Sequence, residues 1–367
     1  MKRKVLFILH TPPPLHGAAT VGKYICESSL INSEFECKYL RLGTTTSFKE
    51  RRKITARKFL RFIKLVIRAF FTSLSFRPDL VYLSITSKGM GFYKDALVVL
   101  ALKLTGSKLL FHFHNKGIRT RQHIKFDDLI YNFVFRKANV ILLSKHIYHD
   151  IKKYVPASRV YYCPNGIPDT INKSQNTKQK ENKEPLEILF LSNLIESKGV
   201  FVLFEACKIL KQKGLTYHCT YVGDAGDVNA QQFHDKVNEL ELTAQIEYVG
   251  KKYGEEKEEV FSNADIFVHP TFEDCFPLIL LEAMQHKLPV VSTFEGGIPD
   301  IVEDGRTGFL VPQKDAVALA EKLEILIQNP TLRQKMGNAG RKKYEEEFTI
   351  NKFEKNLLKI IRDNINA

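Results

Sequence analysis

Short apolar runs alternate with segments of helical spacing along the first 170 residues. The short runs predict buried strands, and the longer segments predict helices that connect one strand to the next. Such alternation favours an α/β fold with a parallel, doubly wound sheet. The expected strands are Lys4–Leu9, Leu80–Ser84, Lys108–His114, Asn139–Ser144 and Val160–Cys163, with helices at Ala18–Leu30 and Asp95–Leu104.

The pattern stops at residues 171–185, which are polar and lack periodicity, and then begins again. Linker composition between two alternating blocks predicts two Rossmann-like domains that face a cleft. We expect the first domain at 1–170, the linker at 171–185 and the second domain at 186–345. Expected strands of the second domain are Leu186–Ser192, Tyr217–Val222, Ile246–Val249, Ile266–His269, Pro289–Ser292 and Gly308–Val311, with helices at Val200–Gln212, Glu255–Asn263, Leu278–His286 and Ala316–Gln328.

Positive charge is concentrated in the first half of the chain. Residues 1–170 hold 30 Lys+Arg and 10 Asp+Glu, a balance of +20, whereas residues 171–367 hold 25 and 31, a balance of −6; together they give the net +14. An anionic partner is therefore expected at the first domain. The sequence contains no recognisable nucleic-acid module, so we do not expect nucleic acid to be that partner.

The segment 49–71 has the composition of a helix that lies on a membrane. Nine positive charges accompany a single acidic residue, Glu50, and apolar residues recur with helical spacing. A basic amphipathic helix of this kind is typical of contact with an anionic lipid surface. The alternative is a surface helix packed on the sheet. The basic residues are Lys49, Arg51, Arg52, Lys53, Arg57, Lys58, Arg61, Lys64 and Arg68, and the apolar ones are Phe59, Leu60, Phe62, Ile63, Val66, Ile67, Phe70 and Phe71.

Several common features are missing from the sequence. No run of 18 apolar residues could span a bilayer, and the short run Val5–Leu9 predicts a first strand better than a signal peptide. The six cysteines form no CxxC pair and have no zinc spacing, which favours buried thiols in a reducing cytoplasm. There is no DxD motif, and we predict neither a metal site nor a cofactor.

The stretch 267–312 places polar groups where a parallel sheet binds ligands. Strand Ile266–His269 should end at the carboxyl edge, and the following loop brings Glu273 and Asp274 there. A helix starting near Pro277 would direct free N–H groups toward a phosphate, with Glu282 one turn further on.

This stretch resembles the donor site of retaining GT-B glycosyltransferases of family four. The seven-residue gap from Asp274 to Glu282, the EAM triplet, the PVV strand, the GGIPD turn and the DGRTGFLV strand all match the family pattern. The family usually has Glu at the position of Asp274 and Gly at that of Pro277, while Glu273 lies one place early. The resemblance covers nearly the whole chain and is most specific in 186–312.

The resemblance implies a role for each donor-site residue. Glu282 would bind the ribose hydroxyls, and Asp274 would contact the donor sugar or stabilise positive charge at the anomeric carbon. The backbone of Phe276, Pro277 and Leu278 would lie along the sugar and phosphates. In LSNLIESKGV, Lys198 matches the lysine that neutralises the donor diphosphate, and Asn193 stands where arginine is usual. Gly250, in YVGKK, matches a strand end that meets the base through its backbone.

Two residues of the first domain complete the expected set. Gly17, in the turn PPPLHGAAT, would allow backbone N–H groups to approach the diphosphate. His114 ends the strand KLLFHFHN in the register of a family histidine that touches the donor sugar. The family also implies that the last helix, at 346–367 within the helical segment Gln334–Ile365, packs on the first domain.

The resemblance therefore predicts a retaining, metal-independent glycosyltransferase that uses a nucleotide-sugar donor. The basic segment adds the hypothesis of a membrane-associated, polyprenyl-linked glycan acceptor in surface polysaccharide synthesis, with the protein peripheral on the inner face of the plasma membrane. Two alternatives remain open. One is a non-hydrolysing nucleotide-sugar epimerase, and the other is a glycosyltransferase-like scaffold whose site has decayed, as Asn193 and Pro277 would suggest.

Overall fold

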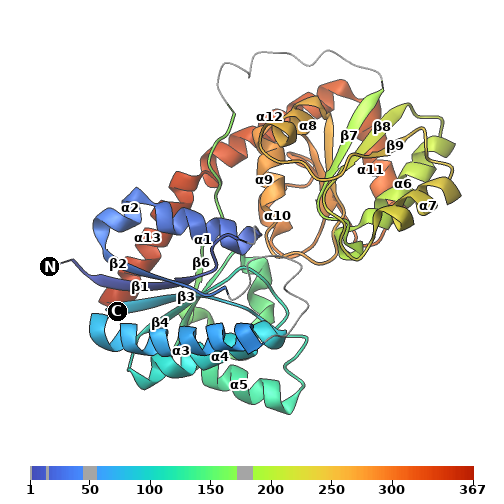
Figure 1. Cartoon of the computed structure of the whole chain (residues 1–367). Helices are drawn as coiled ribbons and strands as arrows, with labels where there is room; N and C mark the ends of the chain where they lie inside the picture. The colour runs from blue at the N-terminus through green and yellow to red at the C-terminus, as the bar shows by residue number, and fades with distance from the viewer. Residues whose placement is uncertain (1, 14–15, 44–55, 172–184) are drawn as a thin grey trace. The chain divides into compact units, whose positions relative to one another are not determined.

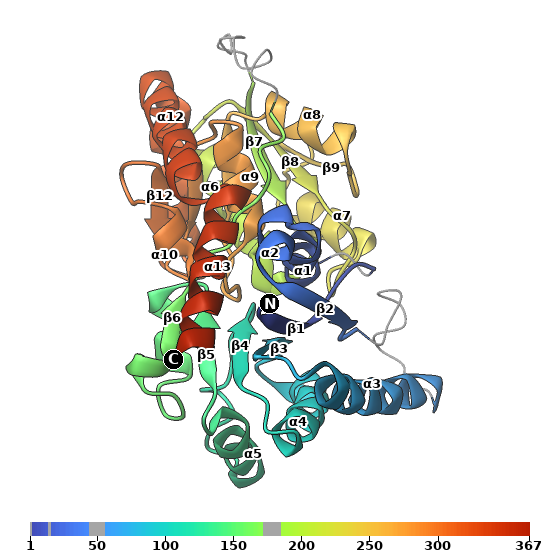
Figure 2. The ribbon, with the colours of Figure 1, turned by 90° about the vertical axis from the view of Figure 1, so that its left-hand side faces the viewer.

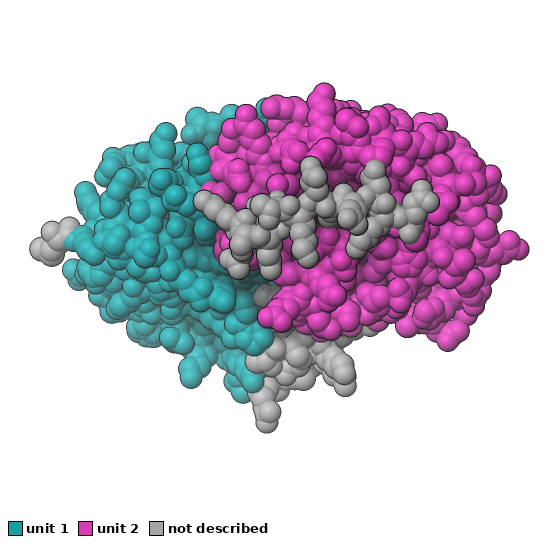
Figure 3. Space-filling model, turned by 90° about the horizontal axis from the view of Figure 1, so that it is seen from above, with its two compact units in different colours: residues 1–166, 350–367 teal, residues 167–349 magenta. Residues whose placement is uncertain are grey.

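The computed structural model describes residues 2–13, 16–43, 56–171 and 185–367 (Figure 1). The chain forms two compact units, residues 1–166 with 350–367 and residues 167–349 (Figure 3). Most of the expected linker 171–185 lies outside the described residues, as do Pro14 and Leu15 of the first turn and residues 49–55 of the basic segment. Side chains of the basic segment are described from Leu60 onward.

The first unit contains a six-stranded, entirely parallel sheet in the order β2-β1-β3-β4-β5-β6. Helices α3, α4 and α5 cover one face, and α1, α2 and α13 lie on the other (Figure 2). The strands are β1 (Lys4–Leu9), β2 (Glu36–Arg41), β3 (Leu80–Ile85), β4 (Leu109–Phe113), β5 (Asn139–Leu142) and β6 (Val160–Tyr162). The helices are α1 (Gly17–Glu27), α2 (Ser29–Glu34), α3 (Ala56–Phe76), α4 (Gly89–Leu104), α5 (Lys125–Phe135) and α13 (Ile350–Asn366), with 3-10 turns η2 (Lys145–Asp150) and η3 (Ala157–Arg159).

The second unit contains another parallel six-stranded sheet, in the order β12-β11-β10-β7-β8-β9. Its strands are β7 (Leu186–Leu191), β8 (Tyr217–Val222), β9 (Ile246–Tyr248), β10 (Ile266–His269), β11 (Val290–Thr293) and β12 (Gly308–Val311). Its helices are α6 (Val200–Gln212), α7 (Ala230–Glu239), α8 (Glu255–Asn263), α9 (Leu278–Gln285), α10 (Ile298–Ile301), α11 (Ala316–Gln328) and α12 (Pro330–Glu347), with the 3-10 turn η4 (Glu196–Lys198).

These two sheets confirm the predicted α/β class with two doubly wound sheets. The strand order reverses between β1 and β3 in the first unit and between β7 and β10 in the second. Loops that leave neighbouring strands at such a reversal diverge to opposite faces, and ligands of open α/β sheets bind in the crevice between them. The fold thus marks one candidate ligand position on each sheet.

The structure adds elements that the hydrophobic pattern did not predict. Strand β2 lies at a sheet edge and buries only Leu40 fully, so its apolar signal is weak. Helix α7 buries only Phe233 and Val237. The expected helix Ala18–Leu30 is divided at Ser28, whose hydroxyl accepts the N–H of Ile31 at 3.2 Å.

The expected helical segment Gln334–Ile365 contains the end of α12 and most of α13, and α13 matches the expected last helix at 346–367. The break follows Phe348, whose buried ring meets Phe276 and whose carbonyl accepts the N–H of Ile167 at 3.0 Å. Helix α13 belongs to the first unit, where Asn139 donates to Asn364 at 2.6 Å and Arg362 pairs with Glu34 at 2.8 Å. None of the helices in the described part of the chain is long and apolar enough to cross a membrane.

Candidate functional site

The loops that follow β7 and β10 meet at the reversal point of the second sheet. The N–H of Phe272 donates to the carbonyl of Ser197 at 2.8 Å, and the hydroxyl of Thr271 donates to the same carbonyl at 2.9 Å. Gly199, at φ +84°, is required here because a Cβ would lie 2.2 Å from the carbonyl oxygen of Pro270. These contacts fix the two loops together, so side chains that are far apart in sequence share one position.

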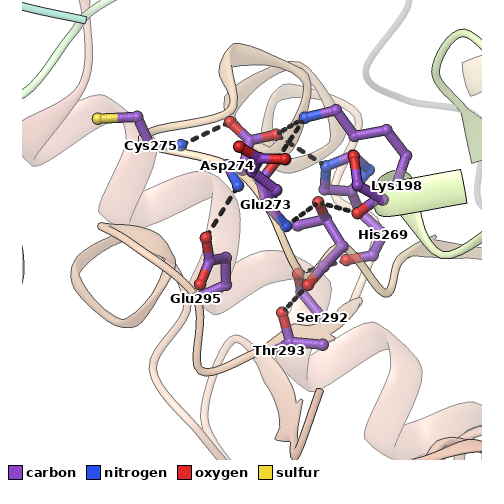
Figure 4. Close-up of polar contacts among 10 residues, drawn as sticks. Lys198, His269, Glu273, Asp274, Cys275, Ser292, Thr293 and Glu295 are labelled. Atoms are coloured by element: carbon purple, nitrogen blue, oxygen red, sulfur yellow. Dashed lines mark hydrogen bonds and ion pairs between the residues drawn. The ribbon is translucent and has the colours of Figure 1, made fainter. Parts of the chain in front are cut away.

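Lys198 and Asp274 form the central ion pair of this site (Figure 4). The Nζ of Lys198 lies 2.6 Å from Oδ2 of Asp274 and 2.9 Å from the carbonyl oxygen of Glu273. The two side chains keep only 21% and 17% of their exposure. The pair is therefore mostly shielded from water, yet a ligand at the sheet edge could still reach it.

His269, at the end of β10, supports the same carboxylate. Its Nε2 lies 3.3 Å from Oδ2 of Asp274, and its ring is buried, which lowers the pKa of His269 and favours the neutral form. Burial alone would raise the pKa of Asp274, but the Lys198 charge and the His269 hydrogen bond outweigh it and hold that pKa well below its usual range. Asp274 is consequently ionised at neutral pH.

A second set of hydrogen bonds holds the backbone of Asp274. Its N–H donates to Oε1 of the buried Glu295 at 2.9 Å, and its own Oδ1 accepts the N–H of Cys275 at 2.8 Å (Figure 4). Gln313 donates to the other oxygen of Glu295 at 2.6 Å. Gly296, at φ +54°, has no room for a Cβ, which would lie 2.5 Å from the carbonyl oxygen of Asp274. The GG turn therefore supports the loop that carries Asp274.

Helix α9 begins directly after this loop, with Pro277 as its N-cap. Among the described residues, no acceptor takes the backbone N–H groups of Leu278 and Ile279. Free N–H groups at a helix start, with the positive end of the helix dipole, suit a phosphate.

Glu282 lies one turn into α9 and forms an ion pair with Lys257 of α8. Both side chains are about a quarter exposed, at 26% and 25%. Burial raises the pKa of Glu282, and the nearby Lys257 charge opposes that rise. The pair places a carboxylate with a charged partner beside the helix start, within reach of a ligand held there.

The contacts of the other predicted residues of the second unit restrict how each could meet a ligand. The ring of Phe276 is buried against Phe348, so only its backbone could meet a ligand. The side chain of Glu273 is exposed, and its carbonyl holds Lys198. Asn193 is exposed, and its Oδ1 accepts the N–H of Asp224 at 3.3 Å. The carbonyl of Gly250, at φ +69°, accepts the N–H of Gly223 at 2.9 Å.

The first unit presents the remaining two predicted residues at its own sheet edge. Gly17 is the first residue of α1, and the preceding His16 accepts the N–H of Ala19 at 3.3 Å. His114 follows β4, and its ring lies 4.2 Å from that of His112. Burial, followed by the nearby His10 and His16, lowers the pKa of His114 to about 3, so its imidazole is neutral.

The predicted residues thus divide between the two units. The second unit brings together Lys198, Asp274 and the start of α9, whereas Gly17 and His114 belong to the first unit. His112, by contrast, pairs with Tyr82 inside the first sheet, which gives it a structural role. Within the described residues, no three or more His, Cys, Asp or Glu side chains gather where they could hold a metal.

Three residues that contact the site, His269, Glu295 and Lys257, were not predicted from the sequence. His269 could have been found, because it is the last residue of a predicted strand that ends at the ligand edge. Glu295 carries a weaker signal, as a buried carboxylate before the GG turn. Lys257 gives no signal, because it lies in a helix with mixed charges and reaches Glu282 only through the fold.

Residues 172–343 match the family model described as glycosyl transferases group 1. Amylovoran biosynthesis glycosyltransferase AmsK of Erwinia amylovora is 32% identical over 256 residues, which are 67% of this chain and 62% of that protein. The putative colanic acid biosynthesis glycosyltransferase WcaL of Escherichia coli strain K12 is 26% identical over 262 residues, 70% of this chain and 64% of that protein. The matched region thus spans only 62% and 64% of the length of these relatives.

Solved structures show the same architecture over nearly the whole chain. Anabaena Alr3699/HepE in complex with UDP has a TM-score of 0.76 at 16% identity, covering 98% of this chain and 100% of that one. The lipopolysaccharide outer core galactosyltransferase WaaB in its apo form has a TM-score of 0.75 at 18% identity, covering 98% and 99%. At these identities the likeness concerns the fold.

Replacing Lys198 by methionine should destabilise the second unit. The substitution leaves the shielded Asp274 carboxylate without its cation, and we expect the free energy of unfolding at pH 7 to fall by about 1–3 kcal/mol. The pKa of Asp274 is depressed in the folded state, so its contribution is present above the pKa of an unfolded Asp and is lost as pH falls through the folded value. The deficit of the variant should therefore shrink below about pH 4. Urea unfolding across this pH range measures it.

Lys213→Met provides the matched control. Its exposed pair with Glu324, at 2.5 Å, should contribute less than about 1 kcal/mol. A deficit for Lys198→Met no larger than that of the control would contradict the assigned role of the Lys198–Asp274 pair.

Proposed function

We propose that the protein is a glycosyltransferase that uses a nucleotide-sugar donor. The proposal is supported by the match of residues 172–343 to the family model of glycosyl transferases group 1 and by the likeness of the fold to solved GT-B structures. The observation that carries this proposal is the Lys198–Asp274 pair beside the free N–H groups of α9, at the reversal point of the second sheet. That position combines positive charge for a diphosphate with a carboxylate for a sugar.

In this proposal the diphosphate of the donor lies between Lys198 and the start of α9. The Nζ of Lys198 turns from Asp274 toward a phosphate oxygen, and the N–H groups of Leu278 and Ile279 donate to the phosphates. These donors stabilise the negative charge that develops on the departing nucleoside diphosphate, which is the main catalytic task of such a transfer.

The carboxylates of the site bind the two sugars of the donor. Glu282 accepts hydrogen bonds from the ribose hydroxyls. These hydroxyls replace part of its present ion pair with Lys257. Asp274, ionised and held by His269 and by the amide of Cys275, contacts the transferred sugar or stabilises positive charge at its anomeric carbon. The backbone of Phe276 and Pro277 lies along the sugar, and that of Gly250 meets the base.

The reaction proceeds with retention of configuration and without a metal ion. A phosphate oxygen of the leaving group takes the proton of the acceptor hydroxyl, so the mechanism requires no separate protein base. Neutral His114 and the backbone beside Gly17 are the first-unit groups proposed to meet the donor. Asn193 supplies an amide where the family usually has arginine, which leaves Lys198 as the main cation for the diphosphate.

The biological setting is proposed from the named relatives. The relatives AmsK, WcaL and the Staphylococcus aureus protein CapM are named for amylovoran, colanic acid and capsular polysaccharide biosynthesis. These names support a role in the synthesis of a surface polysaccharide, with a glycan as acceptor.

The described part of helix α3 supports peripheral contact with a membrane. Phe62, Leu65, Ala69 and Phe76 pack into the core of the first unit, so the predicted apolar stripe is partly structural. Other apolar side chains remain in water beside three cations of the same helix, a composition that suits an anionic lipid surface. The exposed residues are Leu60, Ile67, Phe71 and Leu74, at 66%, 49%, 62% and 46%, with Arg61, Lys64 and Arg68.

Calorimetric titration with UDP, GDP and ADP tests the donor site. We expect micromolar binding of one of the three, weakened by about tenfold or more in Glu282→Ala, because a carboxylate that binds two ribose hydroxyls is removed. Glu259→Ala removes an exposed carboxylate from the neighbouring helix α8 and should bind as the wild type does. If no nucleotide bound to the wild type, the chain would be better described as a scaffold without a working donor site.

Sedimentation with vesicles of phosphatidylcholine and phosphatidylglycerol tests the membrane contact. Changing Arg61, Lys64 and Arg68 to glutamine should lower the bound fraction severalfold at physiological salt, since each cation near an anionic surface contributes about 1 kcal/mol. The control changes Lys335, Lys342 and Lys355, exposed lysines on other helices, to glutamine and should bind as the wild type does. Equal binding by both triple variants would rule out α3 as the contact.

A further inference from the structure

The outer side of one helix layer of the first unit is apolar, although the outer side of a surface helix is normally polar. Helices α3, α4 and α5 form this layer on one face of the first sheet, and α4 packs against both of the others (Figure 2). Seven large apolar side chains of α4 and α5 keep 38–72% of their exposure. They are Met90, Leu97, Leu100 and Leu104 on α4, and Phe126, Leu129 and Phe133 on α5.

The exposed residues of each helix lie along a single stripe. Residues three, four and seven apart share one side of a helix. Leu97, Leu100 and Leu104 of α4 have this spacing, and so do the three exposed residues of α5. The core side of α4 is formed by other residues, among them Phe92 and Leu102. Helix α4 is therefore apolar on its outer side as well as its inner side, which is typical of a helix that is covered.

The stripe of α5 borders α4. The Nζ of Lys103 donates to the carbonyl of Arg136 at 2.9 Å and lies 4.8 Å above the ring of Phe133. At the other end of α5, the ring of Phe126 lies 5.9 Å from that of Tyr93. The exposed apolar groups of the two helices therefore belong to one surface.

The same surface continues onto α3. The hydroxyls of Ser73 and Thr105 share a hydrogen bond of 2.9 Å, and the exposed Leu74 and Leu104 are their immediate neighbours in the chain. Leu74 ends the exposed stripe of α3 that begins at Leu60. An apolar surface that extends over three helices marks a contact with a partner.

The charges of the layer indicate what kind of partner this is. Helix α3 contains no acidic residue, and in α4 and α5 Asp95 and Asp127 are buried while Asp128 pairs with Lys153 at 2.5 Å. Anionic head groups complement an apolar surface bordered by cations, whereas a second copy of the chain would bring like charges together. The exposed cations of the layer include Arg61, Lys64, Arg68, Lys125 and Arg136.

We propose that α3, α4 and α5 together form a membrane-docking face, with the stripes of α4 and α5 in the boundary between the head groups and the hydrocarbon of an anionic bilayer. The inference rests on the proposed contact of α3 and extends it to two helices that lie outside the basic segment 49–71. Helix α3 supplies most of the charge, and α4 and α5 supply most of the apolar contact.

This face determines how the first unit lies on the bilayer. The three helices form one layer parallel to the sheet, so a bilayer that touches all three is parallel to the sheet as well. The carboxyl edge of the sheet, where Gly17 and His114 lie, then opens along the bilayer surface rather than away from it. Contact through α3 alone would leave this orientation undefined.

Tryptophan fluorescence tests the docking face, because the chain contains no tryptophan and a single introduced one reports on its own position. The variants are Phe71→Trp, Leu100→Trp and Leu129→Trp, one on each helix, with Val317→Trp on the exposed side of α11 as control. The vesicles contain phosphatidylcholine, phosphatidylglycerol and brominated phosphatidylcholine. Emission of the first three should shift to shorter wavelength and be quenched, and that of the control should not change.

A pair of apolar substitutions tests the energetic contribution of α4 and α5. Leu100→Gln with Leu129→Gln should weaken partition of the full chain onto the vesicles by about tenfold, because two apolar side chains are lost from the contact. The control is Val317→Gln with Ile325→Gln, two exposed positions on α11, and it should bind as the wild type does. Thermal unfolding midpoints of both pairs should equal that of the wild type, since the changed side chains are exposed.

The possible failures can be told apart. Quenching of Phe71→Trp alone would overturn the inference and leave the contact of α3 in place. Lack of quenching in all three variants would overturn both. A shift of Leu100→Trp and Leu129→Trp without vesicles, with a doubled mass in light scattering, would also overturn the inference, because a second copy would then cover the face. These outcomes do not depend on nucleotide binding in the second unit, so a failure of the donor site would be recognised separately.

Discussion

The ion pair of Lys198 with Asp274 depends on the reversal of strand order between β7 and β10, and the rest of the candidate site depends on the pair. Lys198 lies in the loop after β7 and Asp274 in the loop after β10, so their contact joins the two loops at the edge of the sheet. The surrounding groups all act on the same carboxylate loop: His269 on its side chain and Glu295 on its backbone. Because the pair is shielded from water, its two charges interact strongly. A phosphate of a bound ligand could take the place of Asp274 as the partner of Lys198.

The sequence predicts those features of the fold and the site that are set by residues close together in the chain. Buried parallel strands are continuous apolar runs, so the alternation predicted most of both sheets. The edge strand β2 and the surface helix α7 bury few side chains and were missed for that reason. Within the site, the spacing of Asp274 and Glu282 predicted their shared position. Lys257 could not be predicted, because its contact with Glu282 joins two helices whose packing no local pattern records.

The net charge is distributed unevenly between the two halves of the chain. Residues 1–170 hold a balance of +20, and helix α3 contributes to it. The described part of α3 mixes cations with exposed apolar side chains, a composition that suits an anionic lipid surface. Residues 171–367 hold a balance of −6, and Lys198 lies at the reversal point of the second sheet, where it pairs with Asp274.

Amide hydrogen exchange with and without nucleoside diphosphate tests the central claim most directly, because it reports on every loop of the unmodified chain. With UDP, GDP or ADP, whichever binds, the account predicts slower exchange at residues 193–199 and 270–279, and at Leu278 and Ile279 above all, because these N–H groups gain phosphate acceptors. Slower exchange confined to other parts of the chain, with these two loops unchanged, would contradict a donor site built on the Lys198–Asp274 pair.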